Sequence, residues 1–394
     1  MSKTVTVIGG GPAGMAAALF AARAGARVTL LERNEKLGKK LYITGKGRCN
    51  VTNTAENPMN SIPRNPRFLY SAFASFDAGE LRTLLLANGC PTKEERGGRV
   101  FPESDRASDV TRAMTNALQA AGVEVRLHAR VESLEPLLSA GAVVLATGGA
   151  SYPSTGSTGD GYRLAASAGH TIHPPRPSLI PLLTKETWPT SLQGLSLRNV
   201  RLSARTGKRT RFDELGEMLF THFGVSGPLV LSMSSHILDD ALDTLSVRLD
   251  MKPGLTEEQL LRRLQRDFAE SPRKQLSTIL PQLVPARMAQ VLPGLCGVPA
   301  EKAVGQITRE ERAAIASFLK GIPLTIAGFR PIEEAIITRG GVEVREVDPK
   351  TMGSKLRENL FFAGELLDVD AHTGGYNLQI AFSTGVLAGK SAGA

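Results

Sequence analysis

Residues 4–32 read TVTVIGGGPAGMAAALFAARAGARVTLLE, and this stretch decides the fold. The β-branched run Thr4–Ile8 is typical of a buried parallel strand, and Ala13–Ala24 predicts a helix of small residues. Val28–Leu31 predicts a second strand, with Glu32 at its carboxyl edge. The stretch therefore predicts the strand–turn–helix–strand unit of a doubly wound α/β fold.

The turn between the first strand and the helix fits the GxGxxG pattern through Gly9, Gly11 and Gly14. In this pattern the glycines permit a tight turn, the approach of a pyrophosphate and close helix packing, and the helix N-terminus attracts the anion. Glu32 lies 18 positions after Gly14, where an acid accepts hydrogen bonds from a ribose diol. These residues predict a dinucleotide cofactor; an ordinary glycine-rich turn is the alternative.

A basic, glycine-rich loop follows the second strand over residues 33–50 (RNEKLGKKLYITGKGRCN). NAD and FAD share the turn pattern, but a loop of this kind would wrap a cofactor longer than one nucleotide half. Its basic side chains and backbone amides suit phosphates, and Asn50 is placed to bond a ring edge. The loop therefore favours FAD; a solvated basic loop is the alternative.

Two later apolar segments would close the cofactor site, namely residues 142–149 (AVVLATGG) and 360–365 (LFFAGE). Both predict strands that end in glycine, which lets the backbone lie against a ligand. The small-residue stretch Ile380–Ala388 predicts a helix whose N-terminal amides would face an electron-rich carbonyl or a reduced isoalloxazine. Because the strand at 360–365 and this helix come from the far end of the chain, we expect inserted domains between them and the N-terminal part of the fold.

Five segments carry a family resemblance: GGGPAG at 9–14, TGKGRCNVTN at 44–53, ATGGASYPSTGSTGDGY at 146–162, FTHFGVSGP at 220–228 and FFAGELLDVDAHTGGYN at 361–377. Together they resemble the BaiN-like flavoproteins, the YhiN or aminoacetone-oxidase-type family of FAD-dependent oxidoreductases. The resemblance covers essentially the whole chain. It implies a Rossmann-like FAD-binding domain of the glutathione-reductase superfamily, with an inserted β-rich domain and a small helical subdomain.

The resemblance also implies which residues hold FAD. They are Gly9, Gly11, Pro12, Ala13 and Gly14 at the pyrophosphate; Glu32 and Arg33 at the adenosine ribose; Val131 at the adenine; and, on the flavin side, Lys40, Gly47, Arg48, Cys49, Asn50, Thr147, Gly148, Gly364, Glu365, Gly375, Asn377 and Leu378. Val131 would act through its backbone, in a strand expected over Glu124–Val131. Glu365 departs from the aspartate of many relatives, so its contact with the ribityl chain would be direct or through water.

The middle of the chain differs in composition and predicts a substrate domain. We expect an FAD-binding domain over 1–178 and 330–394, a β-rich domain over 179–254 with a returning strand at 321–329, and a helical subdomain over 255–320. Strands are predicted at Leu195–Ser203, Met218–His222 and Leu245–Met251. Thr256 and Thr308 each open a capping box before an amphipathic helix.

Flavin carries the electron chemistry, so the protein must position the substrate and move protons. The candidates are His372, Tyr376, Tyr152, His222 and Cys49. His372 would act as acid or base near neutral pH, or only order its turn. Tyr376 would donate to a substrate carbonyl, or pack against the flavin. His222 would face the substrate or serve as a structural strand residue. Cys49 has no partner at redox spacing, which favours packing, and no spacing indicates a metal.

The composition and charge of the chain limit the classes of molecule that it is expected to bind. The 394 residues carry a formal charge of +9 from 47 basic and 38 acidic residues, which are mostly interleaved. Aromatic residues make up only 5%, which does not favour a nucleic-acid stacking platform. Six basic residues between Arg198 and Arg211 keep RNA binding open as an alternative, although an exposed strand explains them too.

The same composition predicts a cytoplasmic protein without a membrane partner. Residues 4–22 are uncharged, but Gly9–Pro12 would break a spanning helix there. Three cysteines without a CxxC pair fit a reducing compartment.

These features predict an FAD-dependent oxidoreductase that passes hydride between NAD(P)H, flavin N5 and a small organic substrate such as an enone. Only one dinucleotide pattern is visible in the sequence, so NAD(P)H would dock transiently over the flavin. An amine oxidase that uses oxygen is one alternative. A tRNA-binding or tRNA-modifying flavoprotein is the other.

Overall fold

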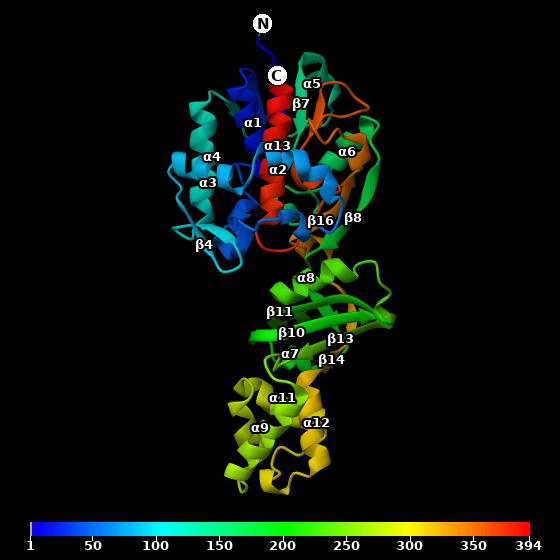
Figure 1. The fold of residues 1–394 in the computed structure, drawn as a ribbon. Coiled ribbons are helices and arrows are strands. Elements are labelled where there is room, and N and C mark those ends of the chain that lie inside the picture. The colour runs from blue at the N-terminus through cyan, green and yellow to red at the C-terminus, as the bar shows by residue number, and fades with distance from the viewer. Residues whose placement is uncertain (1) are drawn as a thin grey trace. The chain divides into compact units, whose positions relative to one another are not determined.

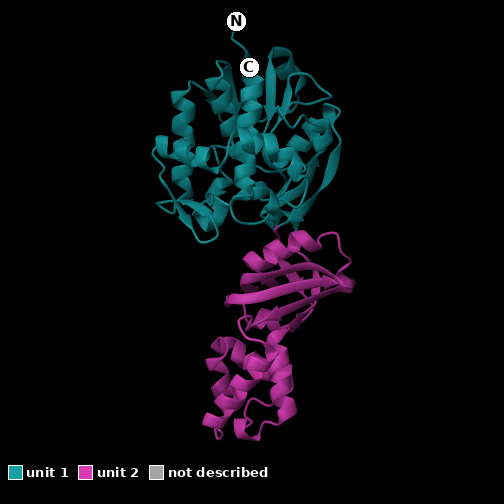
Figure 2. Ribbon diagram, viewed as in Figure 1, with its two compact units in different colours: residues 1–178, 331–394 teal, residues 179–330 magenta. Residues whose placement is uncertain are grey.

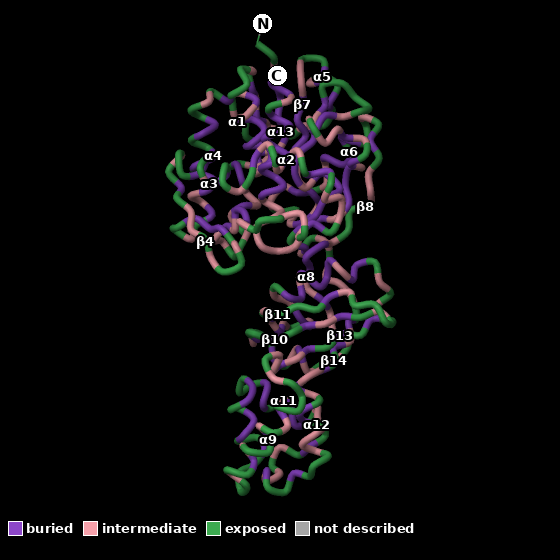
Figure 3. The backbone as a smooth tube through the Cα atoms, in the orientation of Figure 1, coloured by how far each residue is buried: buried purple, intermediate pink, exposed green. Residues whose placement is uncertain are grey.

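The computed structural model describes residues 2–394 and divides into two compact units (Figure 2). Unit 1 comprises the residues up to Ser178 together with Pro331–Ala394, and unit 2 comprises Leu179–Arg330. Each unit has its own cluster of buried apolar side chains. In Figure 3 the buried backbone of each unit follows its central sheet and the helices packed on it. The predicted division of unit 2 at residues 254 and 320 stays a prediction.

Unit 1 is built on a parallel sheet of five strands (Figure 1). Its strand order is β17 (Leu360–Phe362), β7 (Ala142–Leu145), β1 (Thr4–Ile8), β2 (Arg27–Leu31) and β6 (Glu124–Arg126). β1 is central, and Val5 and Val7 are fully buried there, as in a parallel sheet covered on both faces. Because β17 comes from the far end of the chain, the predicted α/β fold with an insertion is confirmed.

The helices of unit 1 cover this sheet and two smaller ones. They are α1 (Pro12–Arg23), α2 (Tyr70–Ser75), α3 (Ala78–Ala87), α4 (Ala107–Ala120), α5 (Glu135–Ala140), α6 (Asp160–Ser167) and α13 (Tyr376–Gly393). The smaller sheets are β16 (Ile337–Val342) with β8 (Ile172–Ser178), and β3 (Thr52–Asn53), β5 (Arg99–Pro102) and β4 (Thr92–Glu95). β8 ends at the last residue of unit 1 before the chain enters unit 2.

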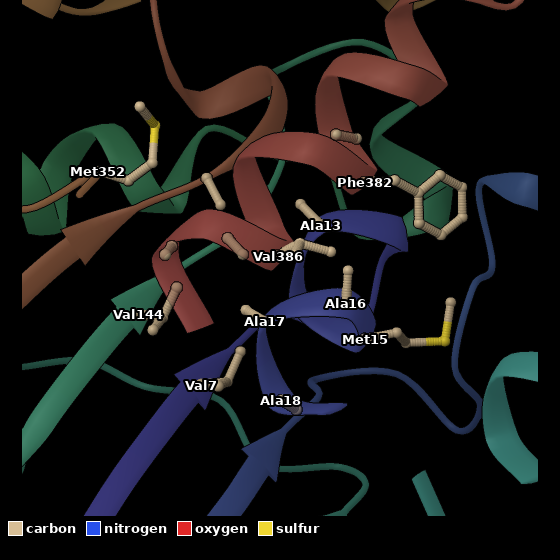
Figure 4. Packing of buried hydrophobic residues seen from close by; sticks show 14 of the residues in the cluster. Val7, Ala13, Met15, Ala16, Ala17, Ala18, Val144, Met352, Phe382 and Val386 are labelled. Carbon is tan, nitrogen blue, oxygen red and sulfur yellow. The ribbon is translucent and has the colours of Figure 1, made fainter. Parts of the chain in front are cut away.

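α1 and α13 pack against each other at backbone distance (Figure 4). A Cβ added at Gly385 would lie 2.2 Å from the carbonyl oxygen of Ala13, and one at Gly389 would lie 2.2 Å from that of Ala17. These glycines are four positions apart, so they lie on one face of α13. The small residues that the sequence placed in both helices therefore bring two helix backbones together.

Unit 2 contains an antiparallel sheet of seven strands and a group of helices (Figure 1). Its strand order is β14 (Ile322–Leu324), β13 (Leu245–Asp250), β10 (Ser196–Thr206), β11 (Arg209–Thr221), β12 (Gly224–Ser226), β9 (Leu182–Thr184) and β15 (Ile326–Phe329). Its helices are α7 (Trp188–Ser191), α8 (Pro228–Ile237), α9 (Glu257–Glu270), α10 (Leu276–Ile279), α11 (Ala286–Cys296) and α12 (Arg309–Lys320). Both predicted capping boxes are present, at Thr256 and Thr308.

Some predicted strands differ in extent from those observed. The strand expected over Glu124–Val131 ends at Arg126, and Val131 lies in an irregular segment after it. This segment turns at His128, whose φ is 54°, and bonds back to the end of β2 instead of continuing the ladder. In unit 2, β11 begins earlier than predicted, and α8 lies in a region expected to be strands. In residues 2–394, no helix combines the length and the hydropathy that crossing a membrane requires.

Candidate functional site

The glycine turn after β1 has the predicted geometry. Gly9 has a φ of 106°, and a Cβ at Gly14 would lie 1.8 Å from the carbonyl oxygen of Gly9, so neither position tolerates a side chain. At Gly11, by contrast, a Cβ would meet nothing within 4 Å. Pro12 opens α1, whose first N–H groups lack helical partners. The turn therefore leaves open space beside a helix N-terminus, which suits a pyrophosphate.

Glu32 is buried at the end of β2 and braces this turn. Its Oε2 accepts a hydrogen bond of 2.6 Å from the backbone N–H of Gly10. Its Oε1 accepts two bonds of 2.7 Å, from the backbone N–H and the side-chain amide of Asn34. Sequence reasoning did not single out Asn34. The acid is thus held in place for a ribose, and its contact with one stays a prediction.

Arg33 pairs with the TGDG segment. Its guanidinium donates to Thr158 Oγ1 at 2.7 Å and to Asp160 Oδ2 at 2.9 Å, and Arg130 lies 3.2 Å from the same carboxylate oxygen. Asp160 begins α6, where a carboxylate is favourable. These bonds join the end of β2 to the segment that follows β7, so both segments face one site. Val131 lies next to Arg130 in sequence and packs partly buried on the core.

Lys40 and Glu365, both assigned to the flavin side, form an ion pair. The Nζ of Lys40 lies 2.8 Å from Oε2 of Glu365 and donates to Ser151 Oγ at 2.7 Å. Glu365 Oε1 also accepts from the backbone N–H of Thr338 at 2.9 Å. Four segments therefore meet at the carboxyl end of β17. Ser151 and Thr338 were not among the predicted site residues, because only the fold brings them to Glu365.

The rest of the basic loop is anchored by acids. Arg48 pairs with Glu95 and with Asp105, and its guanidinium lies 4.1 Å from the ring centroid of Phe101. Two carboxylates offset the charge that was expected to suit phosphates. Leu41–Gly47 forms 3₁₀ turns that are interrupted by non-helical backbone at Thr44, Gly45 and Lys46. Contacts of Gly47 and Arg48 with a flavin stay predictions.

Cys49 is fully buried, and burial raises the pKa of its thiol to about 12. It is therefore a neutral thiol at physiological pH, which supports the packing role over a redox role. The next residue, Asn50, has a buried Oδ1 with no hydrogen-bond partner in residues 2–394, and the same holds for Thr147 Oγ1. Buried polar atoms rarely lack partners, so these two fit a ligand with hydrogen-bonding edges.

The start of α13 closes the site. Gly364 approaches α1 so closely that a Cβ there would lie 2.8 Å from the Cβ of Ala13. Gly375 precedes α13 with a φ of 104°, and a Cβ there would lie 2.2 Å from the carbonyl oxygen of Thr52. Gly148 also has a positive φ, of 74°. The glycines therefore let four segments converge beside the N-terminus of a long helix, which favours negative charge.

The side chain of Asn377 is used within the protein. Its Oδ1 accepts from the backbone N–H of Ala371 and its Nδ2 donates to the carbonyl oxygen of the same residue, both at 2.8 Å. Leu378 packs partly buried on the core. Asn377 thus holds the loop before α13 against the first turn of the helix. Its backbone remains the part that a flavin would meet.

Of the catalytic candidates, His372, Tyr376 and Tyr152 lie in unit 1 and His222 lies in unit 2. His222, the last residue of the strand predicted at Met218–His222, is exposed in the turn that follows β11, which ends at Thr221. Tyr152 has a φ of 52°, and burial together with Glu334 raises the pKa of its hydroxyl. The Nε2 of His372 is buried. Their catalytic roles stay predictions.

Two aspartates in the loop before α13 are buried, which sequence reasoning missed. Asp368 and Asp370 are each 1% exposed. Asp368 Oδ2 lies 2.8 Å from Nε of Arg64, and Asp370 Oδ2 accepts a hydrogen bond from the hydroxyl of Ser178, also at 2.8 Å. Burial raises the pKa of Asp370, against smaller opposing effects of the hydrogen bond from Ser178 and of the charge of Arg339. One buried carboxyl is thus paired with a cation and the other is held toward its neutral form.

The residues present fit FAD. The open space at Gly11, the unpartnered Asn50 and Thr147 oxygens and two helix N-termini suit a pyrophosphate at one end and a polar ring at the other. No group of three or more metal-ligating side chains that would suit a metal ion is present in residues 2–394.

Comparison with known proteins places this geometry in a family. The model of the HI0933-like protein Rossmann domain matches residues 3–391. A 3-dehydro-bile acid delta(4,6)-reductase from Clostridium scindens is 32% identical, and the match covers 98% of this chain and 98% of that protein. A ribosomal RNA dihydrouridine synthase from Haemophilus influenzae is 30% identical, over 96% of this chain and 95% of that protein. Among solved structures, a 3-ketosteroid-delta4-(5alpha)-dehydrogenase from Rhodococcus jostii is 15% identical with a TM-score of 0.46, over 99% of this chain and 96% of that one.

Proposed function

The chain belongs to the HI0933-like Rossmann family of FAD-binding oxidoreductases, and on that premise we propose that it reduces a carbon–carbon double bond conjugated to a carbonyl group. The hydride would come from NAD(P)H by way of flavin N5, and the substrate would be a small organic molecule such as an enone. Two activities named for relatives, a bile acid delta(4,6)-reductase and a dihydrouridine synthase, share this chemistry. In both, the reduced bond is conjugated to a carbonyl.

The observation that carries the proposal is the convergence at the carboxyl ends of β1, β7 and β17. When bound, FAD supplies hydride transfer at N5. The turn at Gly11 would hold the pyrophosphate, and Glu32 would hold the ribose. The Lys40–Glu365 pair would fix the basic loop beside the ribityl chain. The protein's task is then to hold both reactants at fixed distance and to exclude water.

Reduction of such a bond needs a proton as well as a hydride. Hydride adds at the carbon remote from the carbonyl, and the proton adds at the carbon next to it. Tyr376 begins α13, and His372 lies four residues before it, so both stand at the predicted ring end of the cofactor. Either side chain can donate a proton near neutral pH when suitably placed. The helix N-terminus would stabilise the charge that develops on the carbonyl oxygen.

The test separates the two half-reactions. FAD in the purified protein is reduced by light and a deazaflavin without oxygen, and is then mixed with cyclohex-2-enone. We expect flavin absorbance to return and cyclohexanone to appear in equal amount. A reduced flavin that oxygen reoxidises but the enone does not, and an oxidised flavin that amines bleach, would instead support an amine oxidase.

RNA uridine is a second candidate substrate, because uracil carries a double bond conjugated to its C4 carbonyl. The β10–β11 hairpin presents exposed basic side chains at Arg198, Arg201, Arg205, Lys208 and Arg209. Arg201 lies 3.5 Å from Asp213 and Arg211 lies 2.6 Å from Asp240, so acids offset part of this charge. The hairpin supports RNA binding only if its remaining basic side chains contact the phosphates of the RNA.

This second candidate has its own test. Binding of a uridine-containing RNA fragment is measured over a salt series, with the wild type and the Arg205→Gln/Lys208→Gln/Arg209→Gln variant. Phosphate contacts predict an affinity that falls steeply with salt, and a shallower slope in the variant. Equal slopes would exclude the hairpin from RNA binding. Reduced uridine in the RNA after incubation with reduced enzyme would extend the proposed reaction to this substrate.

A further inference from the structure

A pocket of about 520 Å³ opens in unit 1 beside the first turn of α13. Its walls come from the segment after β3, from α2, from the start of α3 and from Tyr376 and Gln379. Pockets of a few hundred Å³ with convergent polar groups are typical small-molecule sites. None of the residues assigned to FAD lines this pocket, so a molecule bound in it would be distinct from FAD.

Three aromatic rings gather in the pocket, although aromatic residues make up only 5% of the chain. Tyr70 and Phe73 are three positions apart on α2 and so lie on one face of the helix. Tyr70 is 57% exposed. The ring of Tyr376 lies over Gly374, where an added Cβ would be 3.1 Å from Cε2. Phe73 and Tyr376 are partly buried against the core, which leaves Tyr70 as the exposed ring on which a heteroaromatic base can stack.

The charge of the pocket is opposite to that of the protein. Glu56 and Asp77 are its only charged lining residues, and within the described residues no lysine, arginine or histidine lines it, although the chain carries +9. Asp77 is fixed as the cap of α3, where its Oδ1 accepts from the backbone N–H of Glu80 at 2.9 Å. Glu56 is exposed on the opposite segment. Carboxylates accept hydrogen bonds from a ribose diol and repel a phosphate.

The pocket is joined to the start of α13 by a hydrogen bond. Asn53, a lining residue, donates from Nδ2 to the carbonyl oxygen of Gly374 at 3.0 Å. The helix that starts there is the one expected to face the flavin ring. Tyr376 and Gln379 from the first turn of α13 line the pocket, so the pocket borders the helix that is expected to face the flavin.

We propose that this pocket receives the adenosine of the nicotinamide donor and makes NADH the preferred donor over NADPH. The inference rests on the proposed function in one respect, namely that a nicotinamide dinucleotide reduces the flavin. The two donors differ only at the adenosine ribose, where NADPH carries a phosphate of charge about −1.5 to −2. Glu56 and Asp77 would bond the diol of NADH and repel that phosphate.

The experiment measures binding and flavin reduction separately. Binding of ADP-ribose and of 2′-phospho-ADP-ribose is followed by saturation-transfer NMR on the FAD-loaded protein, which needs no turnover. Reduction is followed by anaerobic bleaching with NADH and NADPH. We expect about a tenfold preference for ADP-ribose and for NADH in the wild type. Glu56→Arg should level or reverse both preferences, because it replaces a repulsive charge with an attractive one.

Matched variants assign the effect to the pocket. Glu132 is exposed in unit 1 and does not line the pocket, so Glu132→Arg changes the net charge equally and should leave the preference unchanged. Tyr70→Leu should weaken the binding of both ligands several-fold, whereas Tyr70→Phe keeps the ring and should retain the affinity for both.

The outcomes separate this inference from the proposed function. A wild type that prefers NADPH, or a preference that Glu56→Arg leaves unchanged, overturns the inference. A flavin that neither donor bleaches contradicts the proposed electron supply. In that case the binding experiment still tests whether the pocket is an adenosine site. ADP-ribose binding that Glu56→Arg alters supports this site, and the absence of ADP-ribose binding excludes it.

Discussion

The ammonium of Lys40 lies 2.8 Å from Oε2 of Glu365, although 325 positions separate the two residues. The pair is four-fifths buried on both sides, with side-chain exposures of 20% and 16%. It joins the loop after β2 to the carboxyl end of β17, and Ser151 and Thr338 complete its hydrogen bonds. The first and last parts of unit 1 are thus connected at the predicted cofactor site.

Replacing Lys40 should therefore affect both stability and cofactor retention. We expect Lys40→Met to lower the free energy of unfolding by about 1–2 kcal/mol, because it leaves the Glu365 carboxylate without its cation. FAD should also dissociate more readily. Urea unfolding and FAD fluorescence after dialysis measure the two effects. Lys39→Met is the control, because solvent screens the exposed Lys39–Glu35 pair and its loss should leave stability nearly unchanged.

The close contact between α1 and α13 predicts that one methyl group added to α13 lowers the stability of the protein strongly. Gly389→Ala should destabilise the protein by about 2–3 kcal/mol, because the new Cβ would lie 2.2 Å from the carbonyl oxygen of Ala17. Gly254→Ala in unit 2 meets no atom within 4 Å and should change stability by less than about 0.5 kcal/mol. Chemical unfolding monitored by circular dichroism compares them. Equal effects would contradict the close packing.

Gly11 and Gly14 should respond differently to alanine. Gly11→Ala should fold, because the backbone there is extended, with a φ of −78°, and the Cβ meets no atom. It should nevertheless lose FAD by at least about tenfold in affinity, since the methyl group would occupy the space left for the pyrophosphate. Gly14→Ala should fail to fold, because of the contact with Gly9. Thermal unfolding of the apoprotein and FAD titration distinguish the two; a Gly11→Ala protein that keeps full affinity would place the pyrophosphate elsewhere.

Asp370 predicts a pH dependence of stability. Burial raises the pKa of its carboxyl above the ordinary value of 3.8 in the folded chain. The folded chain therefore keeps a proton that the unfolded chain has lost, so this residue's contribution to stability falls as the pH rises from 3.8 toward the folded pKa. Asp368, Arg64 and Arg339 are the charged groups that act on it.

Asp370→Asn removes this titration while it keeps an oxygen that accepts from Ser178. Urea unfolding followed upward from about pH 4 should show the variant gaining stability relative to the wild type as the pH rises toward the folded pKa of Asp370. If the free energies of unfolding of the wild type and the variant instead change in parallel with pH, Asp370 is ionised in the folded protein across this range.

Local patterns predicted the elements that position the cofactor. The strand, glycine turn and helix at the N-terminus are where they were expected, because each depends on neighbours along the chain. The capping boxes at Thr256 and Thr308 follow from the same kind of local rule. The apolar segments 142–149 and 360–365 and the small-residue stretch Ile380–Ala388 predicted β7, β17 and the central part of α13 in the same way.

Long-range partners could not be predicted in this way. The pairing of Lys40 with Glu365, and of Arg48 with Glu95 and Asp105, depends on which strands end at one edge of the sheet. The burial of Asp368 and Asp370 was not predicted, because burial of a charged loop residue requires a cation or donor from elsewhere, here Arg64 and Ser178. β6 stops at Arg126 for a similar reason, since the backbone after it bonds to the end of β2.

The position of α13 has a consequence for synthesis of the protein on the ribosome. β1 and α1 are made first, yet the surface of α1 that receives Gly385 and Gly389 stays uncovered until after all of unit 2 has been translated. Domains fold as they emerge, so unit 2 can be complete while unit 1 still lacks one of its main helices. FAD would be loaded only after translation of the last segment.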